Sequence, residues 1–245
     1  ASRCSWPCAP IHQWLLTQRA LSDTFLSVDL DLRARLHAAL GDPTRLALVD
    51  DLAVSDRSPV ELTDRHGLPS NLLAHHLDVL EQAGLIERTR SAGDGRRRYV
   101  RLRHEILSEL GLSKRLPDAP VLFVCTHNSA RSQMAAAVWS TMSPTPAVSA
   151  GTHPAAQVQP GAVAAASRAG YDLSEATPRS VNEVAIEGHL VVTVCDRAHE
   201  EMVPGSDWLH WSIADPVERA SPEAYDEALS ELETRIRALT EGHNG

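Results

Sequence analysis

The stretch from residue 121 to residue 139 constrains the fold of this 245-residue chain more than any other. Residues 121–124 are an apolar block typical of a buried parallel strand, and residues 133–139 are strong helix formers without Gly or Pro. Between these segments, five residues separate Cys125 from Arg131. The pattern predicts a loop that joins the end of a strand to the start of a helix.

Such a loop is suited to binding an oxyanion. Its backbone N–H groups point toward one centre, and the start of the helix adds positive potential. The guanidinium of Arg131 can bind two oxygens, and the same field favours the thiolate of Cys125 as a nucleophile. The alternative is a buried structural cysteine with a chance arginine nearby, which the complete strand–loop–helix context disfavours. The residues predicted to line the oxyanion site are Thr126, His127, Asn128, Ser129, Ala130, Arg131 and Ser132.

Residues 119–241 resemble the low-molecular-weight protein tyrosine phosphatase family, and residues 129–135 resemble its arsenate-reductase branch more than its phosphotyrosine branch. The resemblance implies an α/β domain over residues 117–245 with a four-stranded parallel sheet. It also implies thiol-dependent reduction of arsenate to arsenite. A phosphatase is the rival enzyme, because phosphate and arsenate share shape and charge, but the chain has few aromatic residues to line a phosphotyrosine cleft. A third alternative is a repressor whose second domain only senses an oxyanion.

The same resemblance suggests roles for two further residues. Asp215 precedes Pro216 after the fourth predicted strand, where the family's Asp-Pro loop supplies a general acid. Cys195 follows the third predicted strand and is either a buried small hydrophobe or a second redox thiol. Thioredoxin-linked relatives carry another cysteine seven positions later, where this chain has Met202. Either a direct Cys125–Cys195 disulfide forms, or a small thiol attacks a Cys125–arsenic adduct. The small-thiol route is favoured because it needs no large movement of Cys195 from the end of a strand.

The resemblance implies no bound cofactor. The expected reductant is an external thiol or redoxin of the mycothiol, glutathione or thioredoxin type. Relatives often hold potassium with a carboxylate where this chain has Ala136, so neither potassium nor another metal is predicted. Asn128 and Ser132 match positions that brace the loop and hydrogen-bond the thiolate, whereas His127 replaces the more common Gly and has no assigned role.

Charge is distributed unevenly along the chain. Residues 1–117 hold 16 Lys and Arg against 15 Asp and Glu, whereas residues 118–245 hold 7 against 17. This asymmetry suggests two domains with different partners. The basic residues of the first half have a focus in Arg88, Arg90, Arg96, Arg97, Arg98, Arg101 and Arg103.

Between residues 21 and 84, apolar residues repeat at helical spacing and are interrupted by Gly and Pro, which predicts a series of helices. Residues 85–90 and 97–102 read as strands joined by a turn at Gly93-Asp94-Gly95. The order predicts an α+β winged helix-turn-helix, although a helical domain without a DNA role is the alternative. Residues 29–103 resemble ArsR-type transcriptional repressors, on the strength of residues 39–46 and 76–86.

This second resemblance implies that residues 21–116 form a homodimeric domain that binds double-stranded DNA. Residues at the exposed start of the recognition helix would face base edges, and wing arginines would meet phosphates. A dimer-packing helix and a linker are expected within residues 104–118. The family's Cys-x-Cys sensor is absent from residues 58–63, which puts the usual metal site in doubt. The residues expected to contact DNA are Ser70, Asn71, Leu72, His75, Arg96, Arg97 and Arg98.

Residues 1–20 contain several prolines and are expected to form a tail. Cys4 and Cys8 could instead capture trivalent arsenic, which binds thiols strongly. Four cysteines in this length do not suggest a disulfide framework, and neither a membrane-spanning run nor a secretory leader is evident. We therefore expect a cytoplasmic protein without a membrane partner.

Overall fold

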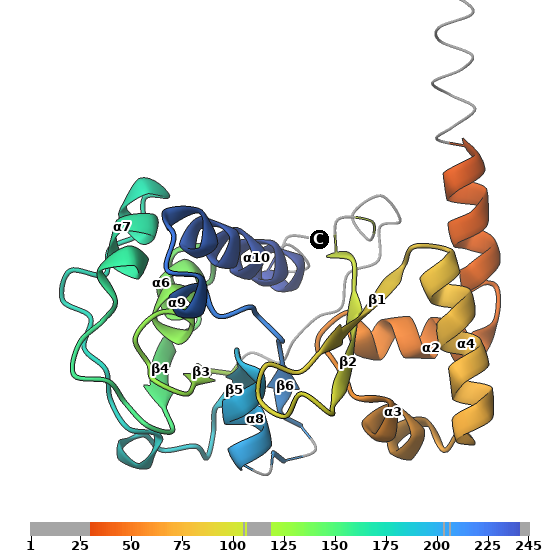
Figure 1. The fold of residues 1–245 in the computed structure, drawn as a ribbon, viewed down its shortest axis with the longest axis horizontal. Helices are drawn as coiled ribbons and strands as arrows, with labels where there is room; N and C mark the ends of the chain where they lie inside the picture. Colours follow the sequence, from red (N-terminus) through yellow and green to blue (C-terminus); the bar gives the residue numbers. More distant parts are fainter. Residues whose placement is uncertain (1–29, 105, 107–118, 203, 206, 241–245) are drawn as a thin grey trace, which may run out of the picture.

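The computed structural model describes residues 30–104, 106, 119–202, 204–205 and 207–240 (Figure 1). Cys4 and Cys8, as well as most of the predicted dimer-packing helix and linker, lie outside these residues. Residues 30–40 are helical. The remaining elements of the first half are α2 (Pro43–Leu52), α3 (Pro59–His66), α4 (Ser70–Gln82), β1 (Ile86–Arg90) and β2 (Arg98–Leu102). Those of the second half are β3 (Val121–Cys125), α6 (Arg131–Met142), β4 (Ala147–Gly151), α7 (Pro160–Arg168), η1 (Val181–Glu183), β5 (Leu190–Thr193), α8 (Asp196–Met202), β6 (Leu209–His210), α9 (Pro216–Arg219) and α10 (Pro222–Thr240).

The first half is a winged helix-turn-helix in which side-chain caps begin α2 and α3. The Asp42 side chain caps α2, and Ser58 with Glu61 forms a reciprocal capping box at the start of α3. Gly67 ends α3 in the left-handed conformation. Strands β1 and β2 pair antiparallel, and together with their connecting loop, residues 91–97, they form the wing. Leucines from the helices and wing residues such as Val100 share one hydrophobic core.

The second half is built on a parallel sheet with strand order β4-β3-β5-β6. Every residue of β3 is buried, as expected for a central strand covered on both faces. Helices α6 and α10 pack against each other on one side of the sheet, and α8 lies on the other side (Figure 1). Parallel pairing brings the carboxyl ends of β3, β4, β5 and β6 to one edge, which confirms the predicted architecture.

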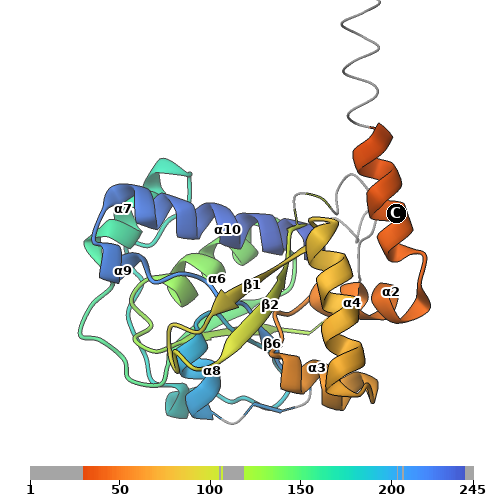
Figure 2. The same ribbon diagram turned by 45° about the vertical axis from the view of Figure 1, so that its right-hand side comes forward.

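Residues 54–57 join the two halves through hydrogen bonds. Arg57 pairs with Val100 of β2 in both directions, with N···O distances of 3.1 and 2.7 Å. On the other side, the Asp56 amide donates to the His210 carbonyl of β6 at 2.7 Å. The side chain of Val54 lies in the hydrophobic core of the second half. The wing therefore lies beside the parallel sheet, with α8 near its loop (Figures 1 and 2).

A buried ion pair reinforces this junction. Asp56 is fully buried and accepts two hydrogen bonds from Arg235 of α10, both at 3.0 Å. Burial raises the pKa of Asp56, but the charges of Arg235 and Arg101 outweigh this effect and lower it. Arg101 also pairs with Glu231. Arg101 belongs to the basic cluster of the first half by sequence, and its guanidinium faces carboxylates at the junction with the second half.

Among the residues that the structure describes, no helix combines the length and the apolar character needed to cross a membrane.

Candidate functional site

The loop from Thr126 to Ala130 connects β3 to α6, as the sequence predicted. Cys125 is the last residue of β3, and α6 begins at Arg131. No side chain caps α6, and its first turn contains no acidic residue. The N–H groups of this turn therefore keep their partial positive charge beside Cys125, as an oxyanion site requires.

The thiol of Cys125 is buried, with 3% of the residue exposed, and polar groups surround its sulfur. The Sγ atom lies 3.0 Å from Oγ of Ser132 and accepts the Asn128 amide at 3.2 Å. The Asn128 amide donates to this sulfur and the Ser132 hydroxyl can do the same, so the two contacts fix the position of the sulfur. The local geometry thus suits a nucleophilic cysteine.

Asn128 holds the loop in its shape. Its backbone adopts a φ of 48°, in the left-handed region that asparagine tolerates better than most residues. Its Nδ2 atom donates to Ser132 Oγ at 2.9 Å, and its Oδ1 atom accepts from Gln133 Nε2 at 3.1 Å and from the Arg179 amide at 2.8 Å. Sequence reasoning missed Gln133 and Arg179, and only the Ser-Gln-Met run after Arg131 offered a signal for Gln133.

Gly151, the last residue of β4, packs against the loop that follows Cys125. A Cβ atom built on Gly151 would lie 2.8 Å from the Thr126 carbonyl oxygen and 2.9 Å from the Asn128 nitrogen. Both neighbours are backbone atoms, which cannot move aside without distorting the loop. Glycine is therefore required at this position for the loop to keep its curvature.

Arg131 and Asp215, predicted from distant parts of the chain, meet in the structure. Nη2 of Arg131 donates to Oδ2 of Asp215 at 2.5 Å, and Nη1 donates to the Ile213 carbonyl at 2.9 Å. The other oxygen of Asp215 caps α9 through the Val217 amide at 3.0 Å. The segment after β6 thus places a carboxylate beside the arginine of the loop.

Cys195 also joins this site. It is 2% exposed, and its Sγ atom lies 3.3 Å from Oγ1 of Thr126, the neighbour of Cys125. Burial raises the pKa of the Cys195 thiol; Arg131 acts to lower it, and the charge of Cys125 acts to raise it further. Cys195 thus contacts the direct chain neighbour of Cys125, a proximity that sequence order alone could not establish. Met202 lies at the end of the following helix, α8.

The remaining loop residues divide into buried and exposed positions. Thr126, Ser129 and Ala130 are buried, so their contribution to an anion would come mainly from backbone N–H groups. His127 is exposed on the rim, where its Nδ1 atom lies 3.0 Å from the His153 carbonyl oxygen.

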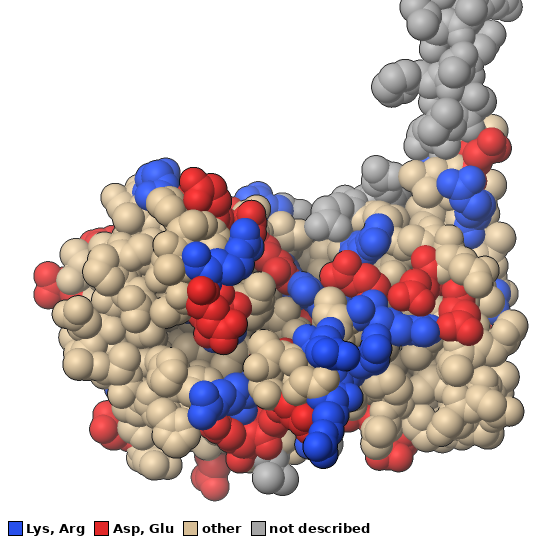
Figure 3. Space-filling model, viewed as in Figure 1, with Lys and Arg blue, Asp and Glu red and all other residues tan. Residues whose placement is uncertain are grey.

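The predicted DNA-contacting residues are accessible. Ser70, Asn71, Leu72 and His75 are exposed on the first turns of α4, whereas His76 packs inward. Arg96, Arg97 and Arg98 are all exposed at the end of the wing. Figure 3 shows Lys and Arg side chains gathered in the middle of the face over the β1–β2 hairpin.

A metal site has no support among the described residues, because no three His, Cys, Asp or Glu side chains there are grouped to hold an ion.

Comparison with known proteins identifies relatives of both halves. The model of the low molecular weight phosphotyrosine protein phosphatase family matches residues 120–242, about half of the chain. An arsenate reductase of Brevibacillus brevis is 32% identical over 134 residues, which cover 49% of this chain and 93% of the relative. A solved arsenate reductase structure from Archaeoglobus fulgidus is 33% identical and covers 48% of this chain and 95% of that chain, with a TM-score of 0.43.

For the first half, a helix-turn-helix domain model matches residues 40–89. The HTH-type transcriptional repressor SmtB of Mycobacterium tuberculosis is 36% identical over 83 residues, which cover 34% of this chain and 59% of the repressor. The chain thus spans less than two thirds of that relative's length.

Proposed function

Since the chain belongs to the low molecular weight phosphotyrosine protein phosphatase family, we propose that it is an arsenate reductase fused to a DNA-binding transcriptional repressor. The observation that carries the enzymatic part is the convergence of Cys125, Arg131, Asp215 and Cys195 at one edge of the sheet. A phosphatase needs the first three residues only. A second buried thiol near the nucleophile can supply the second sulfur for a two-electron reduction and has no role in ester hydrolysis, so Cys195 favours arsenate over a phosphate ester.

In the first step, the loop N–H groups and Arg131 bind arsenate, and the Cys125 thiolate attacks the arsenic atom. A sulfur–arsenic bond forms as one arsenic–oxygen bond breaks. The departing oxygen takes a proton from Asp215 and leaves as water. Ser132 and the Asn128 amide donate to the Cys125 sulfur, which keeps the thiolate oriented toward the anion.

In the second step, the Cys195 thiolate attacks the Cys125 sulfur. The sulfur–arsenic bond breaks and its electron pair stays with arsenic, which leaves as arsenite. The two sulfurs lose two electrons in forming a disulfide, and arsenic gains the same two electrons. The contact of Cys195 with Thr126 favours this route over the small-thiol route that the sequence suggested. An external thiol or redoxin of the mycothiol, glutathione or thioredoxin type then reduces the disulfide.

The DNA-binding part rests on the exposed start of α4 and on the exposed wing arginines. Ser70, Asn71, Leu72 and His75 would meet base edges, and Arg96 to Arg98 would meet phosphates. Two copies of the chain would bind a pseudo-palindromic duplex as a homodimer.

Purified full-length protein offers the direct test of the enzymatic part. Arsenite release and p-nitrophenyl phosphate hydrolysis would be measured with each thiol system, for wild type and for Cys125→Ser. We expect arsenite release from wild type and none from Cys125→Ser, because an alcohol is not ionised near neutral pH. Hydrolysis of the aryl phosphate without arsenite release would favour a phosphatase. Arsenite release by folded Cys125→Ser would refute the assignment of the nucleophile.

A further inference from the structure

We propose that the first turn of α8 couples the oxidation state of Cys195 to the position of the wing. Closing a Cys125–Cys195 disulfide would release the wing from α8 and weaken DNA binding. The inference rests on the proposed function for the disulfide, and it adds a regulatory link between the two halves that neither half has alone.

The wing loop is held by two carboxylates of α8. The Ala92 amide donates to Oδ2 of Asp196 at 2.7 Å, and the Asp94 amide donates to Oε2 of Glu200 at 2.8 Å. The hydroxyl of Ser91 donates to the other oxygen of Glu200 at 2.7 Å. Backbone N–H groups of a wing tip normally face solvent or DNA, so their pairing with carboxylates fixes this loop on the second half.

The fit between the wing loop and α8 is close. A Cβ atom built on Gly93 would lie 2.6 Å from Oε2 of Glu200 and 3.0 Å from Cα of Arg197. The hydroxyl of Tyr99, which is 1% exposed, adds a further bond to Glu200 at 3.2 Å. These contacts hold the wing against α8.

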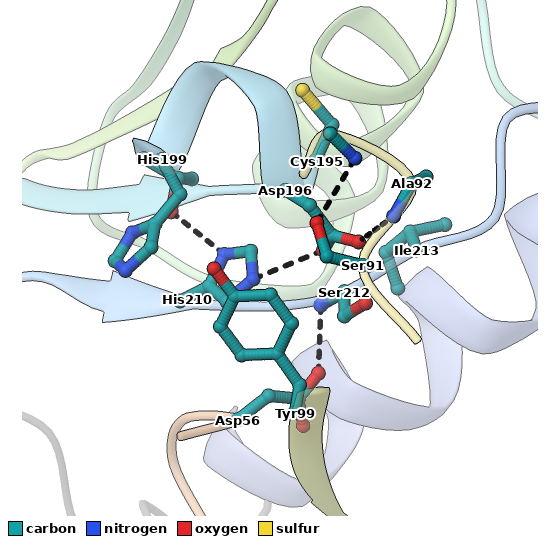
Figure 4. A network of polar contacts seen from close by, with 12 residues as sticks. Asp56, Ser91, Ala92, Tyr99, Cys195, Asp196, His199, His210, Ser212 and Ile213 are labelled. Carbon is teal, nitrogen blue, oxygen red and sulfur yellow. Dashed lines mark hydrogen bonds and ion pairs between the residues drawn. The ribbon is translucent and has the colours of Figure 1, made fainter. Parts of the chain in front are cut away.

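Asp196 connects the contacts between the wing and α8 to the redox site, because it directly follows Cys195. Both of its oxygens are engaged: Oδ2 by the wing and Oδ1 by Nε2 of His210 at 3.2 Å. Figure 4 shows Asp196 between His210 and the backbone of Ala92. His210 is fully buried and belongs to β6, so Asp196 cannot move without disturbing either the sheet or the wing.

We expect disulfide formation to cause such a movement. The Cys195 sulfur now contacts Oγ1 of Thr126 and accepts the Ala198 amide of α8 at 3.4 Å. A disulfide replaces these contacts by a sulfur–sulfur bond of about 2.05 Å with a fixed torsion. The sulfur then leaves the first turn of α8, and the backbone of Cys195 and Asp196 follows it toward Cys125.

The wing arginines explain the direction of the effect. Arg96, Arg97 and Arg98 are exposed while the wing is bonded to α8. A wing held in this way presents the three side chains in one arrangement. A released wing must be ordered again when it binds DNA, which costs conformational entropy and lowers affinity. The linkage is reciprocal, so bound DNA should also disfavour the disulfide.

Hydrogen exchange of the wing amides in the full chain tests the structural step. Exchange at Ala92 and Asp94 would be compared between reduced protein and protein oxidised with diamide, with mass spectrometry to identify the disulfide. We expect at least tenfold faster exchange after oxidation of wild type and no change in Cys195→Ser, which cannot form the bond. Unchanged exchange in wild type that carries the disulfide would overturn the proposal, and so would failure of the disulfide to form.

A binding measurement tests the consequence for DNA. The probe would be a labelled duplex selected from a random library by the reduced full chain. We expect at least tenfold weaker binding after oxidation of wild type. In reduced protein, Glu200→Ala should weaken binding similarly, whereas Glu201→Ala should not, since Glu201 bonds to Thr152 and Arg197 rather than to the wing.

Equal or tighter binding by the disulfide form would overturn the proposal. Arsenite release by Glu200→Ala, measured alongside, separates this failure from failure of the proposed function. If that activity matches wild type while DNA binding ignores oxidation, the enzyme assignment stands and the coupling is wrong. If no arsenite is released by wild type, the proposed function itself fails.

Discussion

The guanidinium of Arg131 and the carboxylate of Asp215 form an ion pair, with 2.5 Å between Nη2 and Oδ2. One residue is the proposed anion-binding cation, and the other is the proposed general acid. An entering oxyanion and Asp215 must therefore compete for the same guanidinium. Binding of arsenate would free the carboxyl group of Asp215 to face the oxygen that leaves.

Asp215→Asn should separate these two effects. We expect kcat for arsenate reduction to fall by about 100-fold or more, because the leaving oxygen loses its proton donor. The inhibition constant of phosphate should fall several-fold, because Asn competes for Arg131 only weakly. Steady-state kinetics with phosphate as inhibitor measure both quantities. An unchanged kcat would remove Asp215 from the mechanism.

Replacing Asn128 by Ala and by Gly tests how the loop is held. Both variants lose the bonds to Ser132, Gln133 and Arg179, but Gly accommodates a φ of 48° and Ala does not. We expect Asn128→Ala to be less stable than Asn128→Gly by about 1 kcal/mol in urea unfolding. Both should lose arsenite release. Wild-type activity in either variant would show that the side-chain bonds do not shape the site.

Arg235→Met should strongly destabilise the junction between the halves. It leaves Asp56 fully buried, with only the more distant Arg101 as a cation, and loss of one partner of a buried pair costs about 3–5 kcal/mol. Urea unfolding of the full chain measures this loss. The matched control is Arg168→Met, which breaks an exposed pair with Asp226 and should cost under about 1 kcal/mol. Equal losses would show that the buried pair is not a special contributor.

His104 should make the fold sensitive to mild acid. Burial, followed by the charge of Arg235, lowers its pKa from the ordinary 6.5 to about 4. The unfolded chain therefore binds a proton at higher pH than the folded chain, and stability is lost as pH falls from 6.5 toward 4. The loss is roughly 3 kcal/mol at most. Wild type should lose more unfolding free energy than His104→Phe between pH 7 and 4.5, whereas parallel curves would contradict the assignment.

The wing arginines should set the salt dependence of DNA binding. Replacing Arg96, Arg97 and Arg98 by Ala should reduce the slope of log affinity against log salt by about 2–3, since each phosphate contact releases counterions. Fluorescence anisotropy over a salt series measures this slope. Arg219→Ala, which removes an exposed arginine of α9, is the control and should leave it unchanged. An unaltered slope in the triple variant would refute phosphate contacts by the wing.

The local parts of the site were predictable because their signals are local. A buried strand, a loop and a helix start follow one another around Cys125, and the capping residues Asp42 and Ser58 lie beside the helices that they begin. The four-stranded parallel sheet and the accessible start of α4 followed from the two family resemblances, whereas the strand order was not predicted. The predicted meeting of Arg131 with Asp215 also depended on a resemblance, because 84 positions separate them.

The contacts that sequence could not provide are those between segments far apart in the chain. The distance from Cys195 to Thr126 depends on how β5 lies beside β3. The preference for a small thiol therefore rested on the missing cysteine at Met202 and on the large movement expected of Cys195. Arg101 belonged to a run of arginines in the sequence, yet carboxylates from α10 and from residue 56 decide where its guanidinium points. The sequence shows where charged residues are concentrated, but which of them form ion pairs depends on how distant segments pack together.

The segment at residues 54–57 also determines what a truncated protein would be. A second half produced without the first half would lack residues 54–57 beside β6. The His210 carbonyl would then lose the Asp56 amide as a partner, and the Trp211 indole would lose the Val54 carbonyl. An uncovered strand edge is a template on which further copies can pair. Each half expressed alone should therefore self-associate. The smallest unit that folds without self-association should contain both halves.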